Sequence, residues 1–432
     1  MQTSLAEFIR DTPEGREAES ILRACVHCGF CTATCPTYQL VGDELDGPRG
    51  RIYLIKQVLE GTPATSKTRD HLDRCLTCRS CETTCPSGVR YGRLADIGRH
   101  VVEEQVPRTG ADRLLRLALR TVLPRPALFG PLLHAARILK PLLPAALARK
   151  VPPQRSAGQR PAPRHARRML VLEGCVQPSI APGINAAATR LLDRLGVSLV
   201  PAADAGCCGA VTHHLNAPAE ALDWMRRNID AWWPAIEAGA EAIVITASGC
   251  TAMVREYGEL LAGDPAYAQR AARVAALSRD LSEVVAAELA RPGAPVPPCA
   301  APGQRVAFHA PCTLQHALRL RGVVEPMLTA LGLELTEVPD AHLCCGSAGT
   351  YSILQPDLSR QLLARKVEAL ESGAPQSILT ANIGCLGHLQ SGSDLPVEHW
   401  IEAVDRLWSG ADAPAPVPTP APTLEEAGQP AR

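Results

Sequence analysis

Two cysteine runs with the same spacing constrain this chain more than any other feature. In each run, three cysteines are separated by pairs of residues, and a fourth cysteine follows after three more residues and precedes a proline. The runs comprise Cys25, Cys28, Cys31 and Cys35, and then Cys75, Cys78, Cys81 and Cys85. Three thiolates on one tight loop can reach three irons of one cube, and this spacing is typical of bacterial [4Fe–4S] proteins. The runs therefore predict cubane iron–sulfur clusters.

The fourth cysteine of each run is expected to bind the cluster of the other run. The proline directs it away from its own loop, and in two-cluster ferredoxins it serves the other cluster. We expect two [4Fe–4S] clusters with exchanged ligands, one on Cys25, Cys28, Cys31 and Cys85, the other on Cys75, Cys78, Cys81 and Cys35. The exchange would bring the clusters close enough for electrons to pass between them.

Zinc sites and disulfides are the alternative uses of these cysteines. A four-cysteine zinc site usually draws on two separated pairs, which differs from these runs. The chain has 17 cysteines, and both the odd number and the grouping favour metal-bound thiolates over disulfides. The N-terminal residues include Glu7, Arg10 and Asp11, which is unlike a secretory signal, so we expect a cytoplasmic protein.

Charge and composition argue against nucleic-acid binding. Lys plus Arg and Asp plus Glu number 44 each, and the chain has only five Trp, six Tyr and four Phe, so there is neither a basic excess nor a series of stacking residues. Some cations could raise the potential of anionic clusters, with an ordinary solvated charge as the alternative for each. These candidates are Arg49, Arg51, Arg74, Arg79 and Arg90.

The second half of the chain contains an internal repeat. In each copy, one predicted strand ends just before a cysteine, a second precedes Cys-Cys-Gly, and a third precedes Gly-Cys. The first cysteine and the pair are 32 residues apart in both copies, from 175 to 207 and from 312 to 344. The predicted strands are 169–172, 198–200 and 242–246, and then 305–308, 334–338 and 377–380. Alternating strands and helices predict two repeated α/β units with parallel sheets.

The cysteines of each copy should gather where the parallel strands end. They are Cys175, Cys207, Cys208 and Cys250 in the first copy, and Cys312, Cys344, Cys345 and Cys385 in the second. They could form a further redox or cluster site, or be small buried apolar residues. His213, His214 and His309 could tune such a site or relay protons, with a structural role as the alternative. Cys299, in a Pro-rich join, is interpreted as incidental.

A basic segment separates the two halves. Residues 113–168 contain thirteen Lys or Arg and no Asp or Glu. Arginines at helical spacing among leucines predict a basic amphipathic helix over 113–122, and the prolines that follow should cut the chain into short pieces. No charge-free run reaches the roughly 18 apolar residues of a membrane span. The segment could dock to a partner, contact the anionic inner membrane surface peripherally, or form an ordinary interdomain helix pair.

These features divide the chain into five parts. Residues 1–106 are expected to form an α-helical two-cluster ferredoxin-like domain, and 107–168 a basic helical segment with a linker. The repeated α/β cysteine-rich units with parallel sheets should occupy 169–291 and 303–409. The Pro-rich stretch 152–164 and the Pro/Ala tail 410–432 are expected to be extended or disordered.

The chain resembles the iron–sulfur subunits of bacterial glycolate oxidase nearly from end to end. The resemblance is carried by CVHCGFCTATCP at 25–36, GDELDGPRGRIYL at 42–54 and CLTCRSCETTCP at 75–86. The repeats are similar to the CCG domains of heterodisulfide reductase subunits and of anaerobic glycerol-3-phosphate dehydrogenase. There the last element is usually Cys-x2-Cys, whereas Ala247 and Asn382 stand three residues before Cys250 and Cys385 here.

The resemblance implies an electron relay. Flavoprotein partner subunits, which would carry FAD, oxidise glycolate, or D-lactate, and this chain passes the electrons toward a membrane acceptor such as quinone. The chain has no Gly-rich dinucleotide fingerprint, no residue of it is expected to be catalytic, and alone it should not oxidise glycolate. The alternative is a redox subunit like those of heterodisulfide reductase or glycerol-3-phosphate dehydrogenase, which uses the CCG cysteines.

Overall fold

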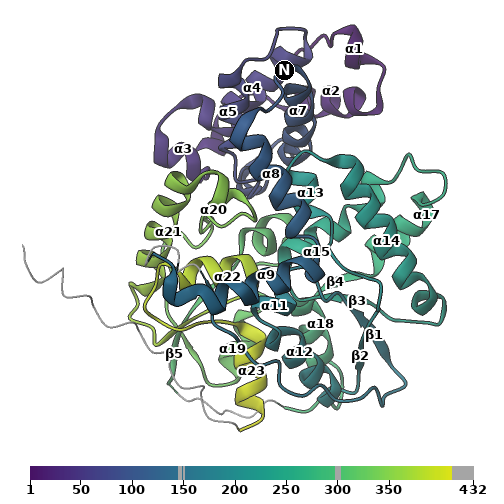
Figure 1. Ribbon diagram of the computed structural model, residues 1–432, viewed down its shortest axis with the longest axis vertical. Coiled ribbons are helices and arrows are strands. Elements are labelled where there is room, and N and C mark those ends of the chain that lie inside the picture. The colour runs from purple at the N-terminus through teal and green to yellow at the C-terminus, as the bar shows by residue number, and fades with distance from the viewer. Residues whose placement is uncertain (145–147, 149–150, 297–302, 411–432) are drawn as a thin grey trace, which may run out of the picture.

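The computed structural model describes residues 1–144, 148, 151–296 and 303–410. Figure 1 shows a helical N-terminal domain at the top of the molecule, and beneath it two α/β units, the first in teal and the second in green to yellow. This arrangement confirms the predicted fold class. The predicted tail and Cys299 lie outside the described residues, except for Gly410.

Short helices build the N-terminal domain around the two cysteine runs. They are α1 (Glu7–Arg10), α2 (Pro13–Ala24), α3 (Pro36–Val41), α4 (Pro48–Leu59), α5 (Ser66–Asp73), α6 (Ser80–Thr84) and α7 (Tyr91–Gln105), with single turns η1 (Phe30–Thr32) and η2 (Glu44–Asp46). Thr12 accepts a hydrogen bond from the Gly15 amide and so caps α2, which delivers Cys25 at its end. Buried Leu22, Ile55 and Leu94 belong to the core that joins α2, α4 and α7.

Each α/β unit contains a four-stranded parallel sheet. The first has the order β2 (Ser198–Pro201), β1 (Arg168–Val171), β3 (Ile243–Ile245), β4 (Ser278–Asp280). The second has the order β6 (Glu334–Leu335), β5 (Arg305–His309), β7 (Ser377–Thr380), β8 (Val397–His399). All six predicted strands are present. The fourth strand of each sheet was not predicted, because β4 and β8 have three residues each, contain charged residues and run directly into helices.

Helices cover both sheets. The first unit has α11 (Gln177–Ile180), α12 (Gly183–Arg194), α13 (Ala210–His214), α14 (Pro218–Glu237), α15 (Ser248–Arg255), α16 (Tyr257–Leu260), α17 (Ala268–Leu277) and α18 (Leu281–Leu289). The second has η4 (Thr313–Ala317), α19 (Glu325–Ala330), α20 (Tyr351–Leu354), α21 (Pro356–Glu371), α22 (Ile383–Gln390) and α23 (Trp400–Trp408). Buried Leu191 of α12 and Val404 of α23 belong to one core that both units share. The units are therefore packed as one body.

The segment between the halves forms α8 (Gly110–Val122), α9 (Pro126–Leu139) and the turn η3 (Lys140–Leu142). The prediction that prolines cut this region into short pieces is wrong for α9, which continues through Pro131. Pro126 occupies the first helical position, where no backbone donor is needed, and Pro131 is exposed and forfeits a single backbone hydrogen bond. Residues 152–164 contain no helix or strand. Within the described ranges, no helix is long and apolar enough to cross a membrane.

Candidate iron–sulfur centres

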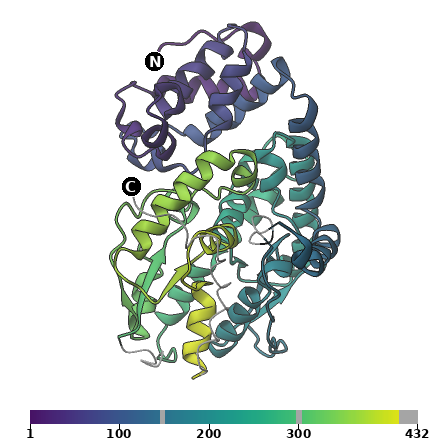
Figure 2. The same cartoon turned by 60° about the vertical axis from the view of Figure 1, so that its left-hand side comes forward.

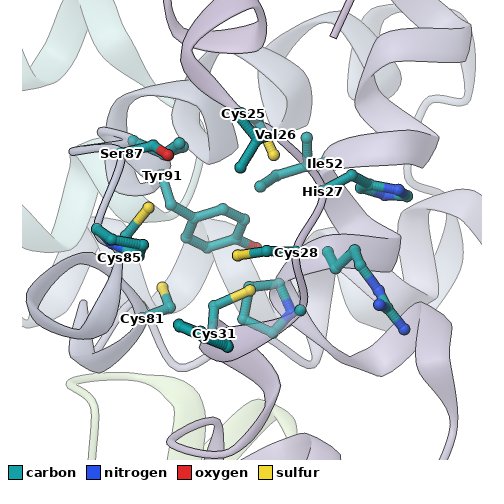
Figure 3. A pocket seen from close by; sticks show the side chains of 16 residues that line it. Cys25, Val26, His27, Cys28, Cys31, Ile52, Cys81, Cys85, Ser87 and Tyr91 are labelled. Carbon is teal, nitrogen blue, oxygen red and sulfur yellow. The ribbon is translucent and has the colours of Figure 1, made fainter.

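Four cysteines predicted to share a cluster line one pocket. Cys25, Cys28, Cys31 and Cys85 surround about 430 Å³ of atom-free space that is partly open to solvent. Figure 3 shows their sulfur atoms, together with that of Cys81, grouped around the Tyr91 ring. We call this the first pocket. Three of the thiols come from the loop between α2 and α3, and Cys85 comes from the second cysteine run.

The other four cysteines line an adjacent pocket. Cys35, Cys75, Cys78 and Cys81 surround about 300 Å³, and we call this the second pocket. Cys81 and Tyr91 line both pockets, so the two hollows share a wall. Each predicted ligand set therefore lies around one hollow, and four soft sulfur donors around a space free of protein atoms suit a cubane cluster.

The two cysteine loops have the same backbone conformation. Left-handed φ angles occur at His27 (61°) and Gly29 (86°) in the first loop and at the corresponding Thr77 (54°) and Arg79 (60°) in the second. Such residues curl a loop so that amide groups point inward, which favours anionic groups. One of these amides, at Thr77, donates to the Cys75 sulfur at 3.4 Å. The loops thus provide hydrogen-bond donors as well as thiols.

Burial disfavours free thiolates in these pockets, because it raises the pKa of a thiol. It raises the pKa of the Cys31 thiol to about 11, and repulsion from Cys25 contributes in the same direction. The pKa of Cys78 and of Cys81 is also raised, chiefly by burial. Iron cations would offset this, because a metal bound to sulfur replaces the proton.

A buried cation distinguishes the second pocket. Arg51 lines it and is 1% exposed. Its guanidinium donates to the carbonyl oxygen of His71 at 2.7 Å and lies 3.4 Å from the Asp46 carboxylate. Burial alone would raise the pKa of Cys75, but the charge of Arg51, followed by that of Arg99, outweighs burial and lowers it. Within the second pocket, these cations therefore stabilise negative charge on the Cys75 sulfur.

The other candidate cations lie in different surroundings. Arg49 lines the first pocket and binds Glu44 at 2.6 Å. Arg79 lines the second pocket and forms an ion pair with Glu256 of the first α/β unit. Arg74 binds Asp46 at 2.8 Å. Arg90 is half exposed, pairs with Glu259, and is the one of the five that fits the alternative of an ordinary surface charge.

The repeat cysteines gather within each α/β unit. In the first unit, the neighbouring thiols of Cys175 and Cys208 raise the pKa of Cys207, and those of Cys207 and Cys250 lower the pKa of Cys208. In the second unit, the sulfurs of Cys312 and Cys344 are 3.9 Å apart, and thiol contacts continue from Cys344 through Cys345 to Cys385. All eight lie near the ends of parallel strands, as the topology predicts.

In the second unit, a histidine lies beside the repeat cysteines. Ligand atoms of His309, Cys345 and Cys385 lie within 4.8 Å of one another. His309 is 2% exposed, its Nε2 atom has no hydrogen-bond partner among the described residues, and burial lowers its pKa to about 3. Neutral imidazole beside thiols can bind a metal. The sequence shows His309 just before Cys312, but its approach to Cys345 and Cys385 depends on strand pairing.

The two repeat groups meet the N-terminal domain differently. Cys312 and Cys344 pack in one apolar cluster with Cys78 of the second pocket. The first unit contacts the N-terminal domain through ion pairs, one of which joins His213 Nε2 to Asp96 of α7 at 3.2 Å. The Asp96 contact and the shared wall at Tyr91 were not foreseen, because nothing in the spacing of these residues signals a contact between distant segments.

Comparisons with known proteins agree with this architecture. The family described as "4Fe-4S dicluster domain" matches residues 21–89, and the family described as "Cysteine-rich domain" matches 169–255 and 306–390. The glycolate oxidase iron-sulfur subunit of Escherichia coli is 59% identical over 94% of this chain and 99% of that protein. The probable glycolate oxidase iron-sulfur subunit of Bacillus subtilis is 29% identical over 87% of this chain and 90% of that protein.

A shorter relative matches part of the chain. Lactate utilization protein A of Geobacillus thermodenitrificans is 28% identical over 54% of this chain and 95% of its own length. The two thiol pockets, the repeated cysteine-rich units and the near end-to-end similarity support one conclusion. The chain belongs to the family of glycolate oxidase iron–sulfur subunits, and it is an iron–sulfur electron-transfer subunit of an oxidoreductase.

Proposed function

We propose that this chain relays electrons from flavoprotein partner subunits, which oxidise glycolate to glyoxylate, toward a membrane acceptor such as quinone. D-lactate is the alternative substrate of those partners. The observation that carries the proposal is the pair of adjacent cysteine-lined pockets, which share Cys81 and Tyr91. Two bound [4Fe–4S] clusters would each take up and release one electron, which suits a partner flavin that receives two.

The proposed ligands follow the pockets. Cys25, Cys28, Cys31 and Cys85 would hold one cluster, and Cys75, Cys78, Cys81 and Cys35 the other. Arg51 and the Thr77 amide would stabilise negative charge in the second pocket. Both effects favour the reduced, more negative state, because cations and hydrogen bonds to sulfur raise a reduction potential.

The first pocket is the proposed entry point for electrons. Cys28 is exposed, and beside it Val26 and Phe30 expose 68% and 63% of their surface. Exposed apolar side chains around a site are typical of docking surfaces. A flavoprotein subunit that covers them would approach the first pocket without an intervening domain of this chain.

A second candidate use concerns the repeat cysteines of the second unit. Their packing against Cys78 supports an additional redox site there, either a further electron carrier or a dithiol as in disulfide reductases. Cys344→Ser should then alter the paramagnetic spectrum or the electron flow from the second pocket, while the matched Cys207→Ser in the first unit should leave the second pocket unchanged. Equal effects of both variants would argue against a role specific to the second unit.

Reduction by substrate tests the main proposal. The chain is purified anaerobically and mixed with glycolate, with and without flavoprotein subunits, and iron–sulfur signals are followed by paramagnetic resonance. We expect reduction only with the flavoproteins present. Glycolate oxidation by the isolated chain would contradict a relay role. If alkylation of Cys207, Cys208, Cys344 and Cys345 abolished turnover, the thiol-reductase alternative would gain support instead.

A further inference from the structure

Helix α8 is amphipathic, but its orientation is the opposite of that of a helix that covers a core. Its polar side faces the protein, where Arg116 binds Asp112 at 3.0 Å and Asp73 at 3.2 Å. Its apolar side faces outward, with Leu114 66% and Leu117 45% exposed, and no residue of α8 is buried. A surface helix normally buries its apolar stripe. Among the residues that the structure describes, the apolar stripe of this helix therefore has no partner.

Helix α9 extends the same exposed surface. Leu133 is its one buried side chain. Eight of the fifteen exposed large apolar residues in the described ranges lie between 114 and 142, so they are concentrated on α8, α9 and the turn η3, whereas such residues are usually scattered. They are Leu114, Leu115, Leu117, Leu128, Leu132, Ile138, Leu139 and Leu142, and we call them the apolar strip. Figure 1 shows α8 and α9 on the near face, and in Figure 2 the same blue helices form the right-hand edge of the molecule.

Basic residues predominate in the segment that carries the apolar strip. Arg113, Arg125 and Lys140 are exposed beside it, and no Asp or Glu occurs from 113 to 168. A cationic margin around exposed leucines complements an anionic lipid surface, where apolar side chains enter the acyl boundary and Arg or Lys contact the headgroups. Protein interfaces are instead enriched in aromatic residues, and none of the eight strip residues is aromatic.

We propose that the apolar strip docks this chain onto the surface of a bilayer that contains anionic phospholipid. Leu114, Leu117 and Leu132 insert beneath the headgroups, and Arg113 and Lys140 contact lipid phosphates. Since no described helix can span a membrane, the contact is peripheral. This inference goes beyond the electron relay and does not depend on it, because vesicle binding requires no electron transfer.

Vesicle flotation tests the docking surface. The full chain, with its clusters, is mixed with vesicles of phosphatidylethanolamine and phosphatidylglycerol, or with vesicles of phosphatidylcholine alone. We expect the chain to float with the anionic vesicles, and to float less at high salt because the charge contribution is screened. Absence of binding to the anionic vesicles would overturn the proposal.

Variants locate the contact. Leu114→Gln with Leu117→Gln should weaken binding to anionic vesicles at least about tenfold, because exposed leucines lose their insertion into apolar surroundings. Arg113→Gln should weaken it about fivefold, the effect of one juxtamembrane charge. The control Ile353→Gln removes an exposed apolar residue outside the strip and should bind like wild type. Iron content should be the same in all of these proteins.

Two other occupants of the strip give distinct outcomes. If the leucine variants floated like wild type but failed to co-purify with a flavoprotein subunit, the strip would be a protein interface and the membrane proposal would be wrong. If sedimentation showed a dimer that the leucine variants dissociate, a second copy would be the occupant. In either case, iron content and reduction by the flavoproteins would still test the electron relay separately.

Discussion

Residues of the helical domain line both pockets, but exposed side chains border the first, whereas a cysteine of the second packs against the second α/β unit. Cys28 is exposed at the first, while Cys78 at the second packs with Cys312 and Cys344. Both loops have the same cysteine spacing and the same left-handed positions. The cysteine spacing therefore determines the kind of cofactor, whereas the surrounding chain determines the charge and the exposure of each pocket. Four substitutions test how these surroundings act.

Replacement of the fourth cysteine of either run should have the largest effect. Cys85→Ser should cost about four of eight irons, because each cubane cluster contains four. With exchanged ligands, its remaining paramagnetic spectrum should match that of Cys25→Ser, and the spectrum of Cys35→Ser should match that of Cys75→Ser. The opposite matching would mean that each run serves its own cluster.

Arg51→Met should lower the stability of the chain and should change the reduction potential of the second-pocket cluster only. It removes a buried cation beside the Asp46 carboxylate, which is 0% exposed and keeps its contact with Arg74, and loss of a hydrogen bond that involves a charged group costs about 2 kcal/mol. The reduction potential of the second-pocket cluster should fall, and that of the first should stay unchanged. Denaturant unfolding and redox titration with paramagnetic detection measure the two effects. Arg51→Lys, which keeps the charge, should restore most of the potential, and a merely structural role would not predict this recovery.

Phe30→Gln should weaken flavoprotein docking at the first pocket. Burial of such a side chain contributes about 1.5 kcal/mol or more, so affinity should fall about tenfold. This affinity is measured by adding increasing amounts of flavoprotein and following the rate at which substrate reduces the clusters. Val41→Gln, at an exposed position on α3 outside this pocket, is the control. Equal effects of the two variants would remove the reason for an entry point at the first pocket.

His213→Gln should change the pH dependence of stability slightly, by about 1 kcal/mol. Burial lowers the pKa of His213, but the Asp96 carboxylate outweighs it and the net shift is upward from 6.5. Its contribution is therefore fully present below about pH 6.5 and is lost as pH rises through the raised value. Burial would raise the pKa of Asp96, but His213 holds it well below 3.8, so its contribution is lost only in strong acid.

Unfolding at a series of pH values checks this prediction. The difference between wild type and His213→Gln should be greatest between about pH 4 and 6.5 and should shrink in alkali. A difference that does not vary with pH would mean that the ion pair between His213 and Asp96 does not stabilise the contact between domains.

Local patterns made much of this architecture predictable. The cysteine spacing predicted the iron–sulfur family, and the repeat predicted two parallel sheets, because both depend on residues close in sequence. Contacts between distant segments were not predictable. Arg51 was one of several candidate cations in the sequence, and only the structure shows its burial against Asp46 and His71. The outward apolar side of α8 was invisible as well, since periodicity shows that a helix has two faces but not which one meets the protein.

Metal analysis shows whether both pockets hold iron–sulfur clusters. Iron, acid-labile sulfide and zinc per chain are measured after anaerobic purification, and the reduced protein is examined by paramagnetic resonance. Two cubane clusters in adjacent pockets predict about eight irons and eight sulfides, with spectra of two interacting centres. Zinc in place of iron, or a single isolated centre with about four irons, would contradict the assignment of two [4Fe–4S] clusters.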